Sequence, residues 1–149
     1  MIPKIPKALV AEHEELHAEL VKLTLLRGKV GEVARTVATL LHPHFVKEEE
    51  FALPPLGLLA EVAAGRVKPE MKAVLPMIDK LRAELPQMLA EHKMVVGALR
   101  RLAAAAKQEK KPEAARFAEA LKRHALSEEQ VLYPAALLVG ECIRAGTEQ

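Results

Sequence analysis

A pattern of histidine and glutamate residues occurs twice in this chain at almost the same spacing. The first copy is Glu12-His13 with His44 and Glu48, and the second is Glu91-His92 with His124 and Glu128. His44 and His124 are 80 residues apart, and each precedes a proline, Pro54 or Pro134, by 10 residues. A repeat of this kind predicts two equivalent structural halves. Because imidazole and carboxylate groups bind transition metals, it also predicts a two-metal centre.

Length and charge limit the kinds of protein that the chain can form. A chain of 149 residues is long enough for one domain with a substantial core. We interpret residues 1–149 as a single domain, with repeat halves at about 7–54 and 86–134. Lys and Arg total 22 against 20 for Asp and Glu. This near balance argues against nucleic acid or an anionic membrane as a partner.

Neither a disulfide nor a targeting segment is expected. Cys142 is the only cysteine, which excludes an internal disulfide and a thiolate-rich metal site. The apolar stretches are shorter than a transmembrane span, and residues 1–4 do not lead into a signal-peptide core. We therefore expect a soluble cytoplasmic protein.

Apolar residues recur at helical spacing in four long segments. These segments are residues 7–27, 30–52, 85–106 and 112–131, with Val131 at the end of the last inward face. Between them we expect a short helix near residues 56–64 and a kinked or separate lead-in to the third long helix. A short helix is expected after Pro134. The pattern predicts an all-α protein, an antiparallel up-down four-helix bundle with an internal two-fold repeat.

The turns between these helices place the repeated histidines at one level of the bundle. His13 lies 15 residues before Gly28 and His44 lies 16 residues after it. At about 1.5 Å per residue, both are roughly 22–24 Å from the same turn, so antiparallel packing brings them level. His92 and His124 are similarly equidistant from the next turn. The four histidines are therefore expected to face one another.

Two carboxylates join this level, because Glu48 and Glu128 each follow a histidine by four residues and share its inward face. Burying such groups is unfavourable unless a metal binds them. A ferritin-like bundle would need Glu-x-x-His on two helices, and only Glu14-x-x-His17 has that form. One tetrahedral zinc would use too few of the residues, whereas two octahedral metals offer about twelve positions.

These residues and the related tails at 48–54 and 128–134 resemble the hemerythrin-like family, the His-His-Glu (HHE) cation-binding domain. The resemblance covers most of the chain. It implies an antiparallel four-helix bundle around two non-haem iron ions, bridged by both carboxylates and by an oxide or hydroxide. The metal-binding residues that it implies are His13, His44, Glu48, His92, His124 and Glu128.

A fifth histidine is expected from a different helix than in the family's oxygen carriers. Those members place it on the third helix, where this chain has Val96 or Met88. Here His17 follows His13 by one helical turn. We include His17 among the metal-binding residues, with a hydrogen-bonding role beside the metals or a solvated side chain as alternatives. The lack of a fifth histidine on the third helix argues against reversible oxygen carriage more than against a metal site.

Several neighbouring residues have weaker patterns. Glu12 and Glu91 precede matched histidines and either orient metal-binding residues or face solvent. Glu49 and Glu129 are also repeated, but spacing favours Glu48 and Glu128 over them. Tyr133 lies nearly half a turn in angle from His124, so we interpret it as a packing residue at a helix end. His42 is expected at the surface.

The resemblance favours a protein that binds, senses or detoxifies a small ligand, namely oxygen, peroxide or nitric oxide. The alternatives are a di-iron enzyme of the peroxidase type and an iron-handling or structural bundle. The expected partner is therefore a small gaseous or peroxide molecule. Sequence does not distinguish binding from turnover, and it does not indicate the oligomeric state or the redox partner.

Overall fold

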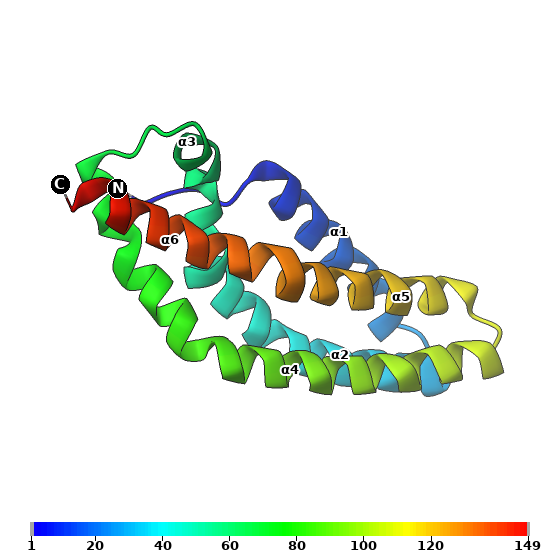
Figure 1. Ribbon diagram of the computed structural model, residues 1–149. Helices are drawn as coiled ribbons and strands as arrows, with labels where there is room; N and C mark the ends of the chain where they lie inside the picture. The colour runs from blue at the N-terminus through cyan, green and yellow to red at the C-terminus, as the bar shows by residue number, and fades with distance from the viewer. Residues whose placement is uncertain (1, 149) are drawn as a thin grey trace.

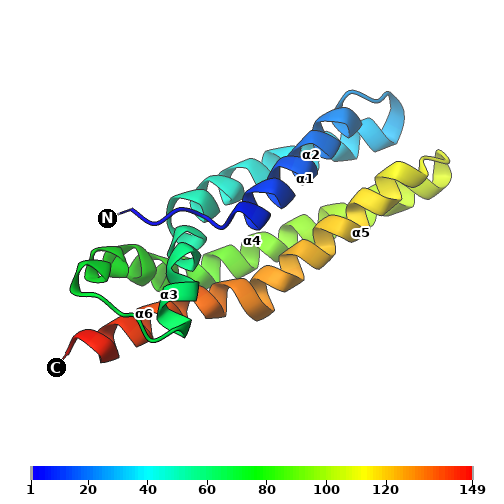
Figure 2. The same ribbon diagram turned by 90° about the horizontal axis from the view of Figure 1, so that it is seen from above.

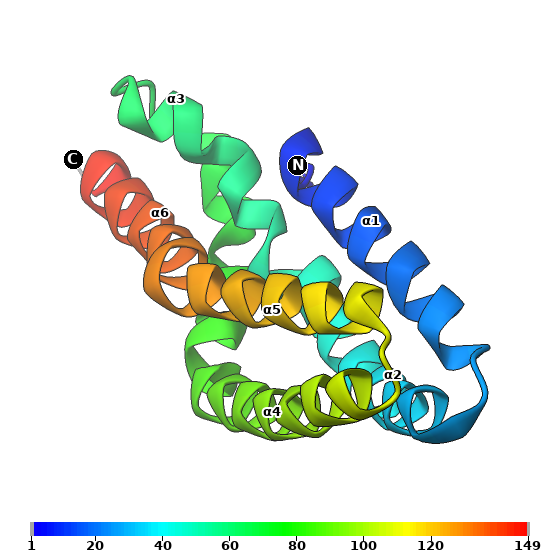
Figure 3. The same ribbon diagram turned by 90° about the vertical axis from the view of Figure 1, so that its right-hand side faces the viewer.

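The computed structural model describes residues 2–148 as a helical bundle. Its four long helices are α1 (Lys7–Thr24), α2 (Gly28–Lys47), α4 (Leu75–Gln108) and α5 (Pro112–Ser127). α2 packs between α1 and α4, and α5 packs against α4 and α1. Successive helices run in opposite directions, and they surround a common core (Figures 1 and 3). The expected fold class, an all-α four-helix bundle, is confirmed.

Prolines shape the third long helix and the segment before it. Pro54 begins a 3₁₀ turn (Pro54–Leu58) that leads into α3 (Leu59–Ala63), the short helix expected near residues 56–64. A second 3₁₀ turn (Pro69–Val74) then leads into α4. Pro86 lies inside α4, which bends in its first half but does not break (Figure 1). The expected lead-in is therefore kinked and continuous rather than separate.

Two π-helical turns interrupt the helices at equivalent positions, Glu48–Ala52 and Glu128–Leu132. In each, a backbone N–H bonds to the carbonyl five residues earlier. Leu53 donates to Glu48 at 2.9 Å, and Tyr133 donates to Glu128. A proline lies two residues after each turn, and its ring would clash with the carbonyl four residues before it in a regular helix. A wider turn relieves that clash and absorbs one extra residue.

After the second π turn the chain continues as α6 (Tyr133–Thr147), which extends the line of α5 (Figure 1). The terminal helix expected after Pro134 is thus present, but it is longer than expected. The inward face does not end at Val131, whose side chain is 59% exposed. The extra residue of the π turn shifts the following positions, so Tyr133 becomes buried instead.

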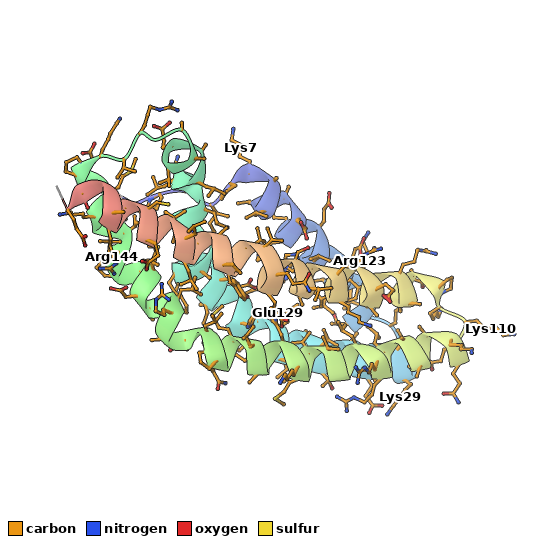
Figure 4. The ribbon with its side chains drawn as sticks, in the orientation of Figure 1. Lys7, Lys29, Lys110, Arg123, Glu129 and Arg144 are labelled. Carbon is orange, nitrogen blue, oxygen red and sulfur yellow. The ribbon has the colours of Figure 1, made fainter. Side chains whose placement is uncertain are left out.

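A carboxylate holds the start of α2 at the far end of the bundle. Gly28 has a φ of 81°, a conformation that glycine adopts without strain. Glu109, just after α4, accepts hydrogen bonds from the backbone N–H groups of Lys29 and Val30 at 3.0 and 2.8 Å. These are N–H groups that a helix start leaves unpaired. Lys29 and Lys110 mark this end in Figure 4.

The apolar core has two parts with a polar layer between them. The larger part lies toward the Gly28 end and includes Leu20, Val37, Leu102 and Phe117. Two smaller clusters, which include Phe51 and Ile78, make up the other part. Figure 2 shows the end of the bundle that carries α3 and both termini. Within residues 2–148 no helix is both long and apolar enough to cross a bilayer.

Candidate metal centre

The polar layer contains the four repeated histidines and two repeated carboxylates. The exposed fractions of these residues are 7% for His13, 1% for His44, 0% for Glu48, 3% for His92, 4% for His124 and 1% for Glu128. They come from α1, α2, α4 and α5 and from the first residue of each π turn. The turn arithmetic therefore placed these six side chains at one level correctly.

The six side chains form two groups that share a carboxylate. One group contains His13, Glu48, His124 and Glu128, and the other contains His44, His92 and Glu128. Within each group the nitrogen and oxygen atoms that could bind a metal lie within 4.8 Å of one another. Glu128 is common to both because Oε1 lies 3.2 Å from Nε2 of His92, and Oε2 lies 3.1 Å from Nε2 of His124.

Three of the four imidazoles are oriented by carboxylates on other helices. Nδ1 of His44 bonds to Glu91 at 3.0 Å, and Nδ1 of His92 bonds to Glu129 at 2.9 Å. Nδ1 of His124 bonds to Glu12. Since each carboxylate accepts the N–H, the Nε2 atom of each ring is left with its lone pair directed into the layer. This is the tautomer that binds a metal through Nε2.

His13 is held differently. Among the described residues its Nδ1 has no recorded hydrogen-bond partner, and its ring stacks on Phe45 with a centroid separation of 4.4 Å. By the repeat, the counterpart of Glu129 is Glu49, but Glu49 is exposed. His13 is therefore the least constrained imidazole of the four.

Burial keeps the imidazoles of His44, His92 and His124 neutral by lowering their pKa values. It lowers the pKa of His44 to about 4, although Glu91 partly opposes the shift. Burial also lowers the pKa values of His92 and His124. The same loss of hydration raises the pKa of Glu128 to about 7. Neutral imidazole is the form that binds a metal ion, so three of the four histidines are already in that form at neutral pH.

Two buried carboxylate oxygens of the polar layer have no hydrogen-bond partner in the described part of the chain and are suited to binding a cation. Glu48 Oε1 and Glu128 Oε2 are buried without a hydrogen bond. Nε2 of His124 lies 3.1 Å from Glu128 Oε2, but it has no proton to donate, because the proton is on Nδ1 and is directed at Glu12. Nε2 of His13 and Nε2 of His124 lie 3.1 Å apart. Without a metal, Nε2–H of His13 can donate to the lone pair of His124 Nε2. The two carboxylate oxygens have no such donor, and a metal ion in the layer would satisfy them.

The model of the hemerythrin HHE cation-binding domain matches residues 4–136. The chain belongs to this family. No curated protein and no solved structure matches it. With the buried cluster of histidine and glutamate, the family assignment identifies a metal-binding protein.

A tyrosine also takes part in this HHE centre. The Tyr133 hydroxyl donates to Glu48 Oε2 at 3.0 Å, and it lies 3.2 and 3.3 Å from Nε2 of His44 and His92. Tyr133 does pack in the core at the start of α6, but its interpretation as a packing residue alone missed the contacts of its hydroxyl with the polar layer. The π turn brings its ring inward, and burial raises the pKa of the hydroxyl above its ordinary value. The repeat counterpart is Leu53, also buried but apolar.

The remaining residues of interest lie around the HHE centre. Of the two roles left open for Glu12 and Glu91, the structure shows the orienting one, and Glu129 also orients a histidine. Figure 4 labels Glu129 between the ribbons of α5 and α4. His42 is exposed, as expected. His17 is also exposed and belongs to neither group of metal-binding atoms. The structure therefore does not bring the expected fifth histidine to the other six residues.

A groove reaches the centre between α1 and α2. It has a volume of about 510 Å³, and its lining includes Leu9, His13, His17, Phe45 and Leu53. His13 is the one residue of the six-residue cluster in this lining. The groove thus approaches the HHE centre from the side of the least constrained imidazole.

Proposed function

We propose that the centre holds two iron ions and binds a small exogenous ligand, namely oxygen, peroxide or nitric oxide, in sensing or detoxification. The observation that carries the proposal is the shared carboxylate of Glu128, which faces one pair of histidines with each oxygen atom. His13 and His124 would hold one ion, and His44 and His92 the other. Glu48 and Glu128 would bridge them. Iron supplies the redox and ligand-binding chemistry.

The chain's own residues determine how the exogenous ligand arrives. The groove between α1 and α2 is mostly apolar, which suits an uncharged diatomic molecule or peroxide, and it ends beside His13. Phe45 stacks on the His13 ring, and both rings line the groove. We infer that the ligand passes Phe45 and binds at the ion held by His13 and His124.

Iron loading followed by azide titration tests the proposal. We expect about two irons per chain and an absorption band that responds to azide, because azide binds where an exogenous ligand would. Replacing Leu9 with Trp should fill the groove and slow azide binding while leaving the iron content unchanged. Elemental analysis that finds one zinc, or no metal, would refute the di-iron proposal. Unchanged azide kinetics in the Leu9→Trp protein would refute the route.

The size of the groove favours a second function, peroxidase-type turnover. A volume of about 510 Å³ is much larger than oxygen or nitric oxide requires and falls in the range of pockets for small organic molecules. An electron-donating organic substrate bound there would lie beside His13. Steady oxidation of a small phenol by the iron-loaded protein with peroxide supports this function, and consumption of peroxide without phenol oxidation excludes it.

A further inference from the structure

We infer that Tyr133 is itself a metal-binding residue, so that its oxygen binds the ion held by His44 and His92. The inference rests on the proposed di-iron function. It adds a phenolate to a set of imidazoles and carboxylates, and it makes the two metal positions different.

The Tyr133 hydroxyl is surrounded by more acceptors than it can satisfy. Glu91 and Glu129 take the Nδ1 protons of His44 and His92, so both Nε2 atoms present lone pairs. The hydroxyl has one proton, which it donates to Glu48. Its contacts of 3.2 and 3.3 Å with the two Nε2 atoms are therefore contacts between lone pairs. A cation among these atoms would turn the contacts into attraction.

The distances agree with neighbouring positions around one octahedral metal ion. Bonds of about 2.1 Å at right angles put adjacent metal-binding atoms about 3 Å apart. The Tyr133 oxygen lies 3.0 Å from Glu48 Oε2 and 3.2 Å from His44 Nε2. Glu128 Oε1 lies 3.2 Å from His92 Nε2. Each of these five atoms thus lies at about the spacing of adjacent positions from at least one of the others, as the atoms around one six-coordinate ion do.

The other half of the centre has no counterpart to this oxygen. Leu53 occupies the equivalent position after the first π turn and contributes only an apolar side chain. It also lines the groove together with His13. The ion held by His13 and His124 would therefore keep an open position toward the groove, while Tyr133 would fill that position on its neighbour. On binding Fe³⁺ the phenol releases its proton to solvent, and the iron keeps its oxidation state.

Spectra of the ferric protein test the inference. We expect a phenolate-to-iron absorption band in the visible region and tyrosinate ring vibrations in the resonance Raman spectrum of the parent chain. Tyr133→Phe should abolish both while two irons remain bound. Leu53→Met, a matched change of similar volume in the other half, should leave both unchanged. Azide should bind once per parent chain and twice per Tyr133→Phe chain.

Iron content measured on the same samples separates the possible failures. Two irons without tyrosinate vibrations in the parent chain would overturn the inference about Tyr133 and leave the di-iron proposal intact. A visible absorption band that persists unchanged in Tyr133→Phe would also overturn it, because the parent band would then not come from a phenolate. Absence of iron would overturn both proposals. If the Tyr133→Phe protein does not fold, the parent spectrum alone decides, because the chain contains only one tyrosine.

Discussion

Glu91 on α4 joins His44 on α2 to Lys47 one turn further along the same helix. One carboxylate oxygen lies 3.0 Å from His44 Nδ1, and the other accepts a bond from Lys47 Nζ at 3.1 Å. Partial burial would raise the pKa of Glu91, but the bonds from His44 and Lys47 lower it overall. Glu91 therefore stays ionised and holds the His44 ring in one orientation.

The first prediction concerns the carboxylates that orient the histidines. Glu91→Gln should lower metal affinity by about 10- to 100-fold, the range found when groups that orient metal-binding histidines are removed. Glu129→Gln should act similarly through His92. Glu49→Gln provides the matched control, because Glu49 is the repeat counterpart of Glu129 but is exposed. Competition with a chelator measures the affinities, and equal losses in Glu49→Gln and Glu129→Gln would contradict the assigned roles.

The second prediction separates His17 from His13. His17→Ala should retain the parent's metal content, because the side chain is exposed and lies outside both groups of metal-binding atoms. His13→Ala should lose metal, because Nε2 of His13 lies 3.1 Å from Nε2 of His124. Elemental analysis of both proteins after identical loading makes the comparison. Metal loss in His17→Ala would return His17 to the metal-binding set.

The third prediction concerns the pH dependence of the metal-free protein. The pKa values of His44, His92 and His124 are lowered in the folded state, so the unfolded chain binds their protons first as the pH falls below about 6.5. Stability should fall with pH in that window. Glu128 acts in the opposite direction, since its pKa is raised to about 7 and the folded state binds its proton first.

Three histidines outweigh one carboxylate, so the metal-free protein should be less stable at pH 5 than at pH 7.5. Each net proton taken up on unfolding changes the free energy of unfolding by about 1.4 kcal/mol per pH unit. Urea unfolding at the two pH values measures the difference. Glu128→Gln removes the opposing effect and should steepen the loss. Equal or higher stability at pH 5 in both proteins would contradict the prediction.

The fourth prediction separates metal binding from stability of the chain. Glu128→Leu removes a buried carboxylate whose Oε2 has no hydrogen bond. Replacing such a group with an apolar one is often neutral or stabilising. The metal-free variant should therefore unfold at the same or a higher temperature than the metal-free parent, while metal should no longer stabilise it. Thermal unfolding with and without metal tests both statements, and a large loss of stability in the metal-free variant would show that Glu128 has a structural role.

Much of the fold and of the metal-binding cluster could be predicted because the helices are regular as far as Glu48 and Glu128, where the π turns begin. Counting residues from Gly28 was enough to place His13 and His44 at one level. The same counting failed for Tyr133, nine residues after His124. In a regular helix, nine residues separate two side chains by about 180° around the helix axis. Because the π turn absorbs one residue, the angle between His124 and Tyr133 is only about 80°. The prolines after both turns were the available signal, since neither fits a regular helix.

His17 illustrates a different limit of sequence reasoning. A step of four residues from His13 rotates the side chain by about 40°, which leaves it on roughly the same face of α1. Whether that edge of the face points at the metal cluster depends on the gap between α1 and α2. The groove fills that gap here, and both His17 and His42 line it. Periodicity gives the direction of a side chain but not the separation of the neighbouring helix.

The π turn at Glu128–Leu132 also sets the rotational phase of α6. Along α6 the buried residues are Tyr133, Ala136, Val139, Gly140 and Ile143. Rewinding the turn as a regular α-helix, with no residue removed, would rotate this whole series by about 100° relative to α5. The C-terminal core would then face solvent as Tyr133 left the centre. The winding of this turn therefore orients Tyr133 at the metal site and the buried face of the last helix together, and neither can be changed without the other.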